Sequence, residues 1–371
     1  MSRDDFPWDI GVYDAHCHPT DTMAAVASIA AMKATTLTVM ATRGEDQELV
    51  RQIAQSLNGD GAHKVLPCFG WHPWFSHQIM DDSQSTPVHK DSHYKAVLSP
   101  TPDDPEFIKH LPTPKVLSDL ISETRDRLQQ FPNALVGEIG LDKSFRLPGI
   151  WTPQDLESRD GQLTPGSREG RRLSPYKVKM EHQRAVLGAQ LRLAGELGRA
   201  VSVHSVQAHG AVLEILKELW VGHERKVMSR RERERQRDAE GAISDDEKEI
   251  EKEHTPRNPL PAPFPPRICM HSYSGPVETI RQFLNRANPS DVYFSFSAVI
   301  NFSGVQAKKA CDVIRALPDD RILVESDLHV AGPQMDQLLE EVTRQICDLR
   351  GWELRHGVQL LADNWKRFVF G

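Results

Sequence analysis

The sequence lacks any apolar run long enough to cross a membrane, because no window approaches the roughly 18 uninterrupted apolar residues that a spanning helix needs. Its first ten residues, MSRDDFPWDI, carry charges and no apolar core, so we expect no secretory signal. The five cysteines include no CxxC pair, and their odd number argues against a disulfide framework. We therefore expect a reducing compartment, which is the cytoplasm with the nucleus as an additional location.

Excess positive charge is also absent. The chain has 45 Lys and Arg against 52 Asp and Glu, a formal net charge of −7. This balance argues against sequence-blind electrostatic attraction to nucleic acid. It leaves open a nuclease whose metal ions hold the phosphate locally. The 39% hydrophobic and 26% charged content is that of a soluble globular protein with an ample core.

Short apolar runs rich in β-branched residues alternate with longer segments of helical period. The eight runs are Gly11–His16, Thr36–Ala41, Val65–Gly70, Ala134–Ile139, Ala200–His204, Arg267–His271, Val292–Ser297 and Arg321–Ser326. The helical segments are Thr20–Lys33, Glu45–Leu57, Val116–Gln130, Lys177–Leu197, Ala211–Trp220, Val277–Arg286, Val305–Leu317 and Gln334–Arg350. This alternation predicts an α/β protein, a (β/α)8 TIM-type barrel with catalytic groups at the carboxyl ends of its strands.

Three segments interrupt the alternation, so we expect one barrel over residues 1–371 with insertions at about 76–114, 145–175 and 222–266. The first two have little apolar periodicity and are interpreted as loops. The third contains a basic half, RKVMSRRERERQR, followed by an acidic half, SDDEKEIEKEH. Such charge blocks are typical of a solvated helix or of disorder with few core contacts. A nucleic-acid patch is the alternative, although the adjacent acids neutralise the basic half.

Histidines end several of the predicted strands. His16 and His18 are two residues apart, a spacing that places both imidazoles on one face of a strand. A His-x-His pair can give a metal two nitrogen ligands from one rigid element, although two such histidines also meet by chance. His204 and His271 each close an apolar strand. One buried histidine is commonly a satisfied core group, whereas two at equivalent strand ends favour a shared site.

Two carboxylates accompany these histidines. Glu138 lies inside an apolar strand, where burial is costly unless the group binds a cation or is well hydrogen-bonded. Glycines on both sides of it predict close backbone approach. Asp327 follows the last strand, where it could instead be a helix N-cap. Four imidazoles and two carboxylates can hold two divalent ions if Glu138 bridges them. The ligand types suit Zn, Mn or Mg, without choosing among these metals.

The motifs HCH, GWHP, VGEIGLD, VSVH, MHSYSG and ESD, with QRAVLGAQLRLAGELG before the fifth strand, resemble the TatD family of metal-dependent deoxyribonucleases in the amidohydrolase superfamily. The resemblance implies a TIM-type barrel that hydrolyses DNA phosphodiesters with two metal ions. It assigns His16, His18, Glu138 and Asp327 to one metal, and Glu138, His204 and His271 to the other. Asp327 would also accept a proton from the attacking water, and His72 of GWHP would contact the substrate phosphate.

The chain departs from the family pattern in two motifs. Leu328, His329 and Val330 follow ESD in place of a small residue and proline, and Lys143 replaces the usual aromatic after GLD. The insertions resemble those of fungal TatD-type proteins that interact with a cell-cycle ubiquitin-ligase subunit. Two alternatives to DNA or oligonucleotide hydrolysis therefore stay open. One is hydrolysis of a small-molecule amide or lactone, and the other is a barrel scaffold that binds a protein partner through residues 222–266.

Overall fold

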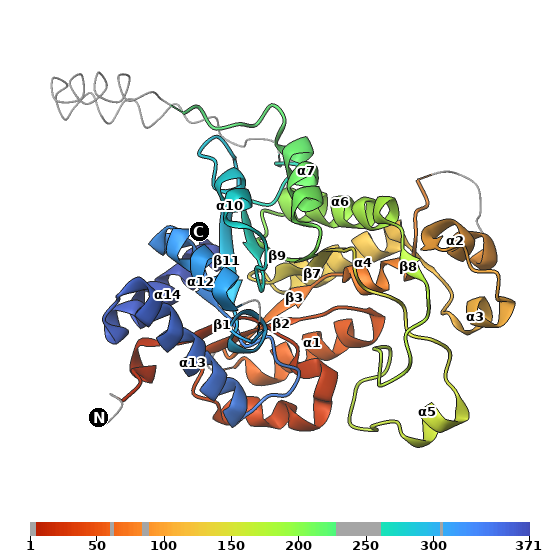
Figure 1. The fold of residues 1–371 in the computed structure, drawn as a ribbon, viewed down its shortest axis with the longest axis horizontal. Coiled ribbons are helices and arrows are strands. Elements are labelled where there is room, and N and C mark those ends of the chain that lie inside the picture. The colour runs from red at the N-terminus through yellow and green to blue at the C-terminus, as the bar shows by residue number, and fades with distance from the viewer. Residues whose placement is uncertain (1–4, 60–62, 84–88, 228–260, 305–306) are drawn as a thin grey trace.

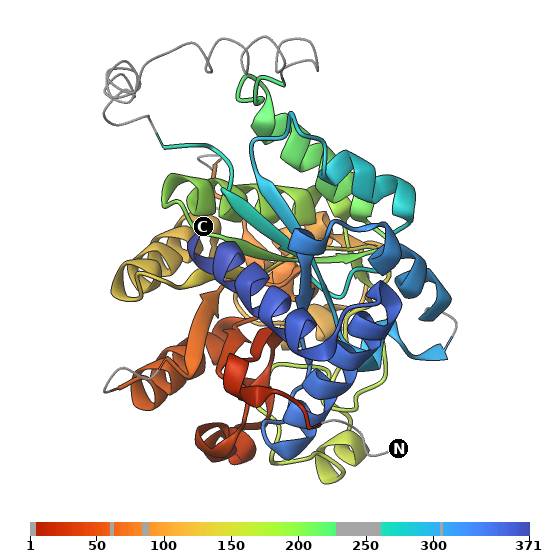
Figure 2. The same cartoon turned by 90° about the vertical axis from the view of Figure 1, so that its left-hand side faces the viewer.

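The computed structural model describes residues 5–59, 63–83, 89–227, 261–304 and 307–371. Eight parallel strands form a TIM-type barrel surrounded by helices, which confirms the predicted fold class (Figures 1 and 2). In spatial order they are β1 (Tyr13–Cys17), β2 (Thr36–Met40), β3 (Val65–Phe69), β7 (Leu135–Asp142), β9 (Val201–Val206), β10 (Arg267–Met270), β11 (Asp291–Phe296) and β12 (Ile322–Val324). Each predicted run overlaps one of these strands. Among the described residues, no helix is both long and apolar enough to span a bilayer.

The barrel closes where β12 meets β1. The Asp327 backbone N–H donates to the His16 carbonyl over 3.0 Å. The buried side chain of Asp14 accepts hydrogen bonds from the Ser326 backbone N–H at 3.0 Å and the Ser326 hydroxyl at 2.5 Å. These bonds join the first strand to the last, and they bring the residues after both strands to the same end of the barrel.

Helical segments follow the strands and cover the outside of the barrel. They are η2 (Pro19–Ala31), α1 (Gly44–Leu57), α4 (Leu117–Gln130), α6 (Met180–Glu196), α7 (His209–Trp220), α10 (Val277–Phe283), α12 (Ala307–Ala316) and α13 (Pro333–Arg350). The first of them differs from expectation because η2 is a 3-10 segment that is kinked at Thr22. Only Pro19, Thr20, Thr22 and Ile29 are buried in it. This segment therefore has no continuous apolar stripe that would favour a regular α-helix.

A ninth long helix, α14 (Leu354–Phe370), was missed by the sequence analysis. It closes the amino end of the barrel, where Trp365 and Phe368 pack in one cluster with the inward residues of the strands, including Met40 and Cys68. The Trp365 indole N–H donates to the Thr38 hydroxyl over 3.2 Å. The barrel interior is therefore filled at this end, whereas the carboxyl end holds the cavity that contains Glu138.

The insertions contain more structure than loops. Between β3 and α4 lie η3 (Pro73–Gln78), β4 (Ile79–Met80), α2 (Lys90–Val97), β5 (Leu98–Ser99), α3 (Pro105–His110) and β6 (Lys115–Val116), and after β7 come α5 (Pro153–Glu157) and β8 (Lys177–Val178). Tyr94 and Phe107 of the first insertion share a buried cluster with Leu147 and Tyr176 of the second. The two insertions thus form one packed lobe, which Figure 1 shows beside the barrel. Residues 228–260 of the charged insertion lie outside the described part.

The remaining short elements connect the larger ones. They are η1 (Trp8–Ile10), α11 (Ala298–Asn301) and η6 (Asp319–Arg321). Of these, α11 follows β11 at the open end of the barrel and contributes Ile300 to the cavity there.

Candidate metal centre

Glu138 lies at the centre of a buried cluster at the open end of the barrel. Its side chain is almost fully buried, and five imidazoles approach it within 3.4 Å. The histidines are His16, His18, His72, His204 and His271. All the histidines singled out in the sequence therefore meet at one carboxylate.

The two oxygens of Glu138 face different histidines. Oε2 lies 3.4 Å from Nε2 of both His16 and His18. Oε1 lies 2.9 Å from Nδ1 of His204 and 2.8 Å from Nε2 of His271. Oε1 also lies 3.1 Å from Nε2 of His72, so His16 and His18 face one oxygen and His72, His204 and His271 face the other.

Glycines allow the strand that carries Glu138 to approach its neighbours. A Cβ added to Gly137 would lie 2.9 Å from the Cys68 sulfur. A Cβ on Gly140 would lie 2.0 Å from the His204 carbonyl oxygen. Both distances are shorter than van der Waals contact, so the close approach predicted from these glycines is confirmed. It sets Glu138 within reach of the histidine at the end of β9.

Asp327 joins the cluster from the loop after β12. Its Oδ1 lies 3.5 Å from Nε2 of His18. Its backbone has φ of +54°, in the left-handed region that a non-glycine residue rarely occupies. The hydrogen bond from its N–H to the His16 carbonyl holds this conformation and aims the carboxylate at the same cavity as His18.

Neighbouring side chains orient two of the imidazoles. Nδ1 of His16 lies 2.8 Å from the Ser202 hydroxyl, which leaves its Nε2 directed at Glu138. Nε2 of His204 lies 3.2 Å from Oδ2 of Asp142, so its Nδ1 faces Glu138. Fixing one ring nitrogen in this way prepares the other to act as a ligand.

Two carboxylates at the site were missed by the sequence analysis as functional residues. Asp142, the last residue of β7, holds His204 as described above. Glu325 is fully buried, and it accepts hydrogen bonds from the Ser272 backbone N–H at 2.8 Å and from the Ser295 hydroxyl. Its Oε1 is 3.8 Å from Nδ1 of His271. Their positions inside GLD and ESD, next to residues already selected, were the available signal.

Burial and charge compete in this cluster. Burial would raise the pKa of Glu138, but the imidazoles of His72, His271 and His16 outweigh burial and hold that pKa well below its usual range. Burial would lower the pKa of His271, yet Glu138 raises that pKa well above its ordinary value. The carboxylates therefore require positive charge inside the cavity, which either protons on the histidines or bound cations can supply.

The donor set fits divalent cations. The described residues contain three groups of imidazole nitrogens and carboxylate oxygens. Within each group, the ligand atoms all lie within 4.8 Å of one another. The groups are His16, His18 and Glu138; His72, Glu138 and His204; and His16, His271 and Glu325. In addition, the buried Nδ1 of His271 has no hydrogen-bond partner among the described residues. Imidazole and carboxylate ligands without thiolate suit Zn, Mn or Mg.

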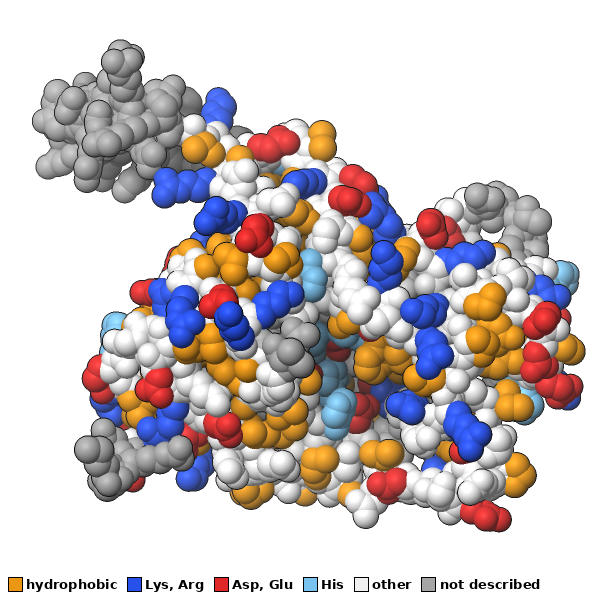
Figure 3. Space-filling model, in the orientation of Figure 1, with side chains coloured by type: hydrophobic (Ala, Val, Ile, Leu, Met, Phe, Trp, Pro, Cys, Tyr) orange, Lys and Arg blue, Asp and Glu red, His pale blue; other side chains and the backbone are white. Residues whose placement is uncertain are grey.

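The cluster forms the floor of a cavity of about 320 Å³. Figure 3 shows this cavity as a hollow near the middle of the face, with pale-blue histidine atoms inside and orange hydrophobic side chains beside it. Trp74, Phe145 and Ile300 contribute apolar walls, and Arg168 comes from the second insertion. The volume is that of a small-molecule site.

Comparisons with known proteins agree with this architecture. A family described as "TatD related DNase" matches residues 13–370. Cut9-interacting protein scn1 of Schizosaccharomyces pombe is 38% identical, over 96% of this chain and 98% of its own. A Saccharomyces cerevisiae protein named uncharacterized deoxyribonuclease YMR262W is 27% identical over the same shares. The crystal structure of a TatD family hydrolase from Entamoeba histolytica has the same fold, with a TM-score of 0.56 at 10% identity over 97% of this chain and 98% of that one.

The family match covers the barrel strands and every residue of the candidate centre, from His16 to Asp327. The relative at 38% identity spans nearly the whole chain as well. This chain therefore belongs to the TatD-related DNase family of hydrolases.

Proposed function

We propose that this protein is a metal-dependent hydrolase that cleaves phosphodiester bonds of DNA. The observation that carries the proposal is the division of the two Glu138 oxygens between two groups of histidines. A carboxylate so placed is suited to bridge two cations. The family description and the relative named a deoxyribonuclease support DNA as the substrate.

In this proposal each ion is held by residues from several strands. His16, His18, Glu138 and Asp327 hold one ion, and Glu138, His204 and His271 hold the other. When bound, a pair of divalent ions supplies a water of lowered pKa and offsets the charge of the phosphate. The protein contributes the fixed positions of these donors and a cavity with apolar walls.

Asp327 is the proposed proton acceptor for the attacking water. A general base must be ionised, and burial alone would oppose ionisation of this group. The histidines His18, His271 and His16 outweigh burial and hold the pKa of Asp327 well below its usual range. The Ser272 hydroxyl lies 3.3 Å from its Oδ2 and fixes the carboxylate further. Asp327 is thus ionised near neutral pH, which a general base requires.

The test combines metal analysis with a nuclease assay. Purified protein is analysed for Zn, Mn and Mg and then assayed on single- and double-stranded DNA with added Mg or Mn. We expect metal-dependent cleavage by the wild type. Glu138→Gln should lose most of one metal and nearly all activity. Asp327→Asn should retain at least one metal while its rate falls by about 10²–10⁴-fold, the usual loss for a general base.

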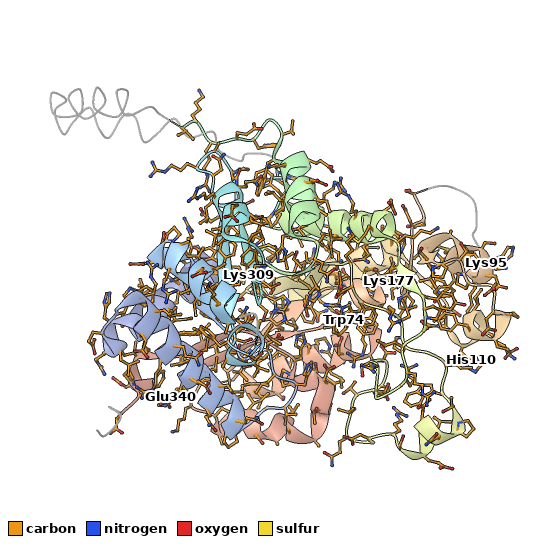
Figure 4. The ribbon with its side chains drawn as sticks, viewed as in Figure 1. Trp74, Lys95, His110, Lys177, Lys309 and Glu340 are labelled. Atoms are coloured by element: carbon orange, nitrogen blue, oxygen red, sulfur yellow. The ribbon has the colours of Figure 1, made fainter. Side chains whose placement is uncertain are left out.

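Glu340→Gln is a matched control, because Glu340 lies on α13 away from the cavity (Figure 4). It should keep both metal and activity. If both site variants cleave as fast as the wild type, the cluster is not the active site. If the wild type binds metal but cleaves no phosphodiester, hydrolysis of a small amide or lactone becomes the better hypothesis.

A second function is favoured by one specific observation. The relative at 38% identity is named for interacting with Cut9. We propose that this chain could also bind a protein partner, with the insertion at 222–266 as the contact. Most of that insertion lies outside the described residues. A pull-down comparing the full chain with a deletion of residues 226–251 tests this role separately from hydrolysis.

A further inference from the structure

An aromatic pair lies at the mouth of the cavity. The rings of Trp74 and Phe145 are stacked, with centroids 4.6 Å apart and planes 9° from parallel. Both side chains line the cavity that contains Glu138 and His204. Trp74 is nevertheless 37% exposed, and it belongs to none of the hydrophobic clusters formed by the described residues. Much of this large ring is therefore available to a ligand.

The indole of Trp74 is held in place next to the metal-binding side chains. Its N–H donates to Oδ2 of Asp142 over 2.6 Å, and the same oxygen lies 3.2 Å from Nε2 of His204. Its ring lies 4.7 Å from that of His72 and 5.9 Å from that of His204, measured between centroids. A planar group stacked on Trp74 would therefore lie next to His72 and His204, which belong to the proposed site of hydrolysis.

A cation lines the same cavity. Arg168 is exposed, and within the described ranges its guanidinium forms no ion pair with a carboxylate. Its Nε donates to the Arg171 carbonyl over 3.0 Å, which leaves its other N–H groups free for an anion. Figure 3 also shows blue side chains on both sides of the hollow. Lys177 and Lys309, labelled in Figure 4, do not line the cavity, and their ammonium groups donate to the carbonyls of Lys143 and Ser274. An exposed ring beside free positive charge matches a ligand with both a planar base and a phosphate.

We propose that Trp74, supported from behind by Phe145, is a stacking platform for an unpaired nucleobase next to the bond that is cleaved. Arg168 binds the phosphate attached to that nucleotide. Stacking on an aromatic ring accepts any base, because each has a planar face. The pair therefore makes the protein prefer substrates with a base at this position over phosphodiesters without one. This inference rests on the proposed function, whose substrate it defines further.

The experiment measures binding of metal-loaded protein to a fluorescently labelled single-stranded oligonucleotide. Phosphorothioate linkages slow its cleavage during the measurement. A series of such oligonucleotides carries one abasic residue, moved along the chain one position at a time. For the wild type, removing the base at one position of the oligonucleotide should weaken binding by about 5- to 150-fold, which is the range for stacking of one base.

Two substitutions remove the platform in different ways. Phe145→Leu removes the supporting ring and leaves the hydrogen bond between Trp74 and Asp142 in place. Trp74→Leu removes the platform itself. Each substitution should weaken binding of the complete oligonucleotide. Each variant should bind the oligonucleotide that lacks the critical base as tightly as the wild type does. This loss of coupling separates direct stacking from general damage to the site.

Trp352→Leu is the matched control, because Trp352 packs near the end of α13 and does not line the cavity. It should retain the wild-type difference between complete and abasic oligonucleotides. Equal binding of all oligonucleotides by the wild type, or no binding of any, would overturn the platform. Base-dependent binding without cleavage under any metal would preserve the platform and reject the proposed function. Cleavage whose rate depends neither on the base nor on either substitution would support the proposed function and reject the platform.

Discussion

At the scale of single residues, the hydrogen bonds of His72 distinguish its role from that of the other histidines. Its Nδ1 accepts the Trp74 backbone N–H over 3.1 Å. In a neutral imidazole the proton must then be on Nε2, which points to Oε1 of Glu138 at 3.1 Å. Burial lowers the pKa of His72 to about 4, so the ring is neutral near pH 7. A nitrogen that carries a proton is not a metal ligand, and this N–H would become free to donate to a phosphate if cations took its place at Glu138.

We therefore predict that His72→Gln weakens substrate binding without removing metal. KM for DNA should rise by about 10- to 100-fold, as expected when a hydrogen bond to a charged group is lost. Elemental analysis should find the wild-type metal content. His110→Gln, on the exposed helix α3, is the control and should change neither quantity. A fall in metal content for His72→Gln would instead identify His72 as a ligand.

Most of the residues predicted from sequence lie at or just after the end of an apolar strand, whereas Glu138 lies inside one and His72 was assigned from its motif. Parallel strands bring their carboxyl ends together, so His204 and His271 were predictable without any knowledge of their contacts. Asp142 and Glu325 were not, because their roles depend on partners distant in sequence. Asp142 bonds Trp74 and His204, and Glu325 bonds Ser272 and Ser295. No local pattern indicates which of several nearby acids will face those partners.

At the scale of elements, one buried arginine joins the barrel to its second insertion. Arg43, just before α1, is only 1% exposed and lies between the carboxylates of Asp21 at 2.9 Å and Asp46 at 3.3 Å. Its guanidinium also donates to the carbonyls of Thr164 at 3.3 Å and Pro165 at 3.1 Å. These bonds anchor the loop that carries Arg168 over the cavity.

We predict that Arg43→Met both destabilises the protein and loosens this loop. Breaking a buried ion pair by removing one partner costs about 3–5 kcal/mol, here because Asp46 stays buried without its cation. Urea unfolding measures the loss of stability. Hydrogen exchange of the amides of Thr164 and of residues 166–168 should accelerate under native conditions, because their anchor is absent.

Two further variants sharpen this test. Arg51→Met changes a partly exposed arginine of α1 that pairs with the exposed Glu48, so its effect on stability should be below about 1 kcal/mol. Arg43→Lys keeps the charge but lacks the planar fork that reaches both carboxylates and both carbonyls, so we expect only partial rescue. Unchanged exchange in the loop of the Arg43→Met protein would show that other contacts anchor it.

Some elements could not be predicted because their sequence signal is weak. The short helices α2 and α3 pack against residues of the second insertion, and that long-range contact is absent from any local window. Helix α14 has a clear apolar face, but it comes after the eighth strand–helix pair, and eight pairs already complete a barrel. Its role follows from the barrel interior, where Trp365 and Phe368 fill the amino end.

At the scale of the whole molecule, the two ends of the barrel differ in the groups that they bury. The amino end is closed by apolar packing, so its stability does not depend on a ligand. The carboxyl end gathers buried carboxylates and imidazoles whose charges balance only if protons or cations are present. The native state should therefore gain stability from divalent cations, because the unfolded chain cannot assemble donors from β1, β7, β9 and β10.

We predict that removing metal lowers the melting temperature of the protein. A cation present at 100 times its dissociation constant stabilises the native state by about 2.7 kcal/mol per site. For a chain of 371 residues that corresponds to roughly 3–4 °C per site. Untagged protein melted in a series of Zn, Mn or Mg concentrations, and in a chelator, provides the measurement.

The melting temperature should rise with the logarithm of the metal concentration once the site is saturated. In Glu138→Gln this dependence should be much weaker, because the residue that faces both groups of histidines has lost its charge. Equal metal dependence in the two proteins would place the stabilising cation somewhere other than the Glu138 cluster.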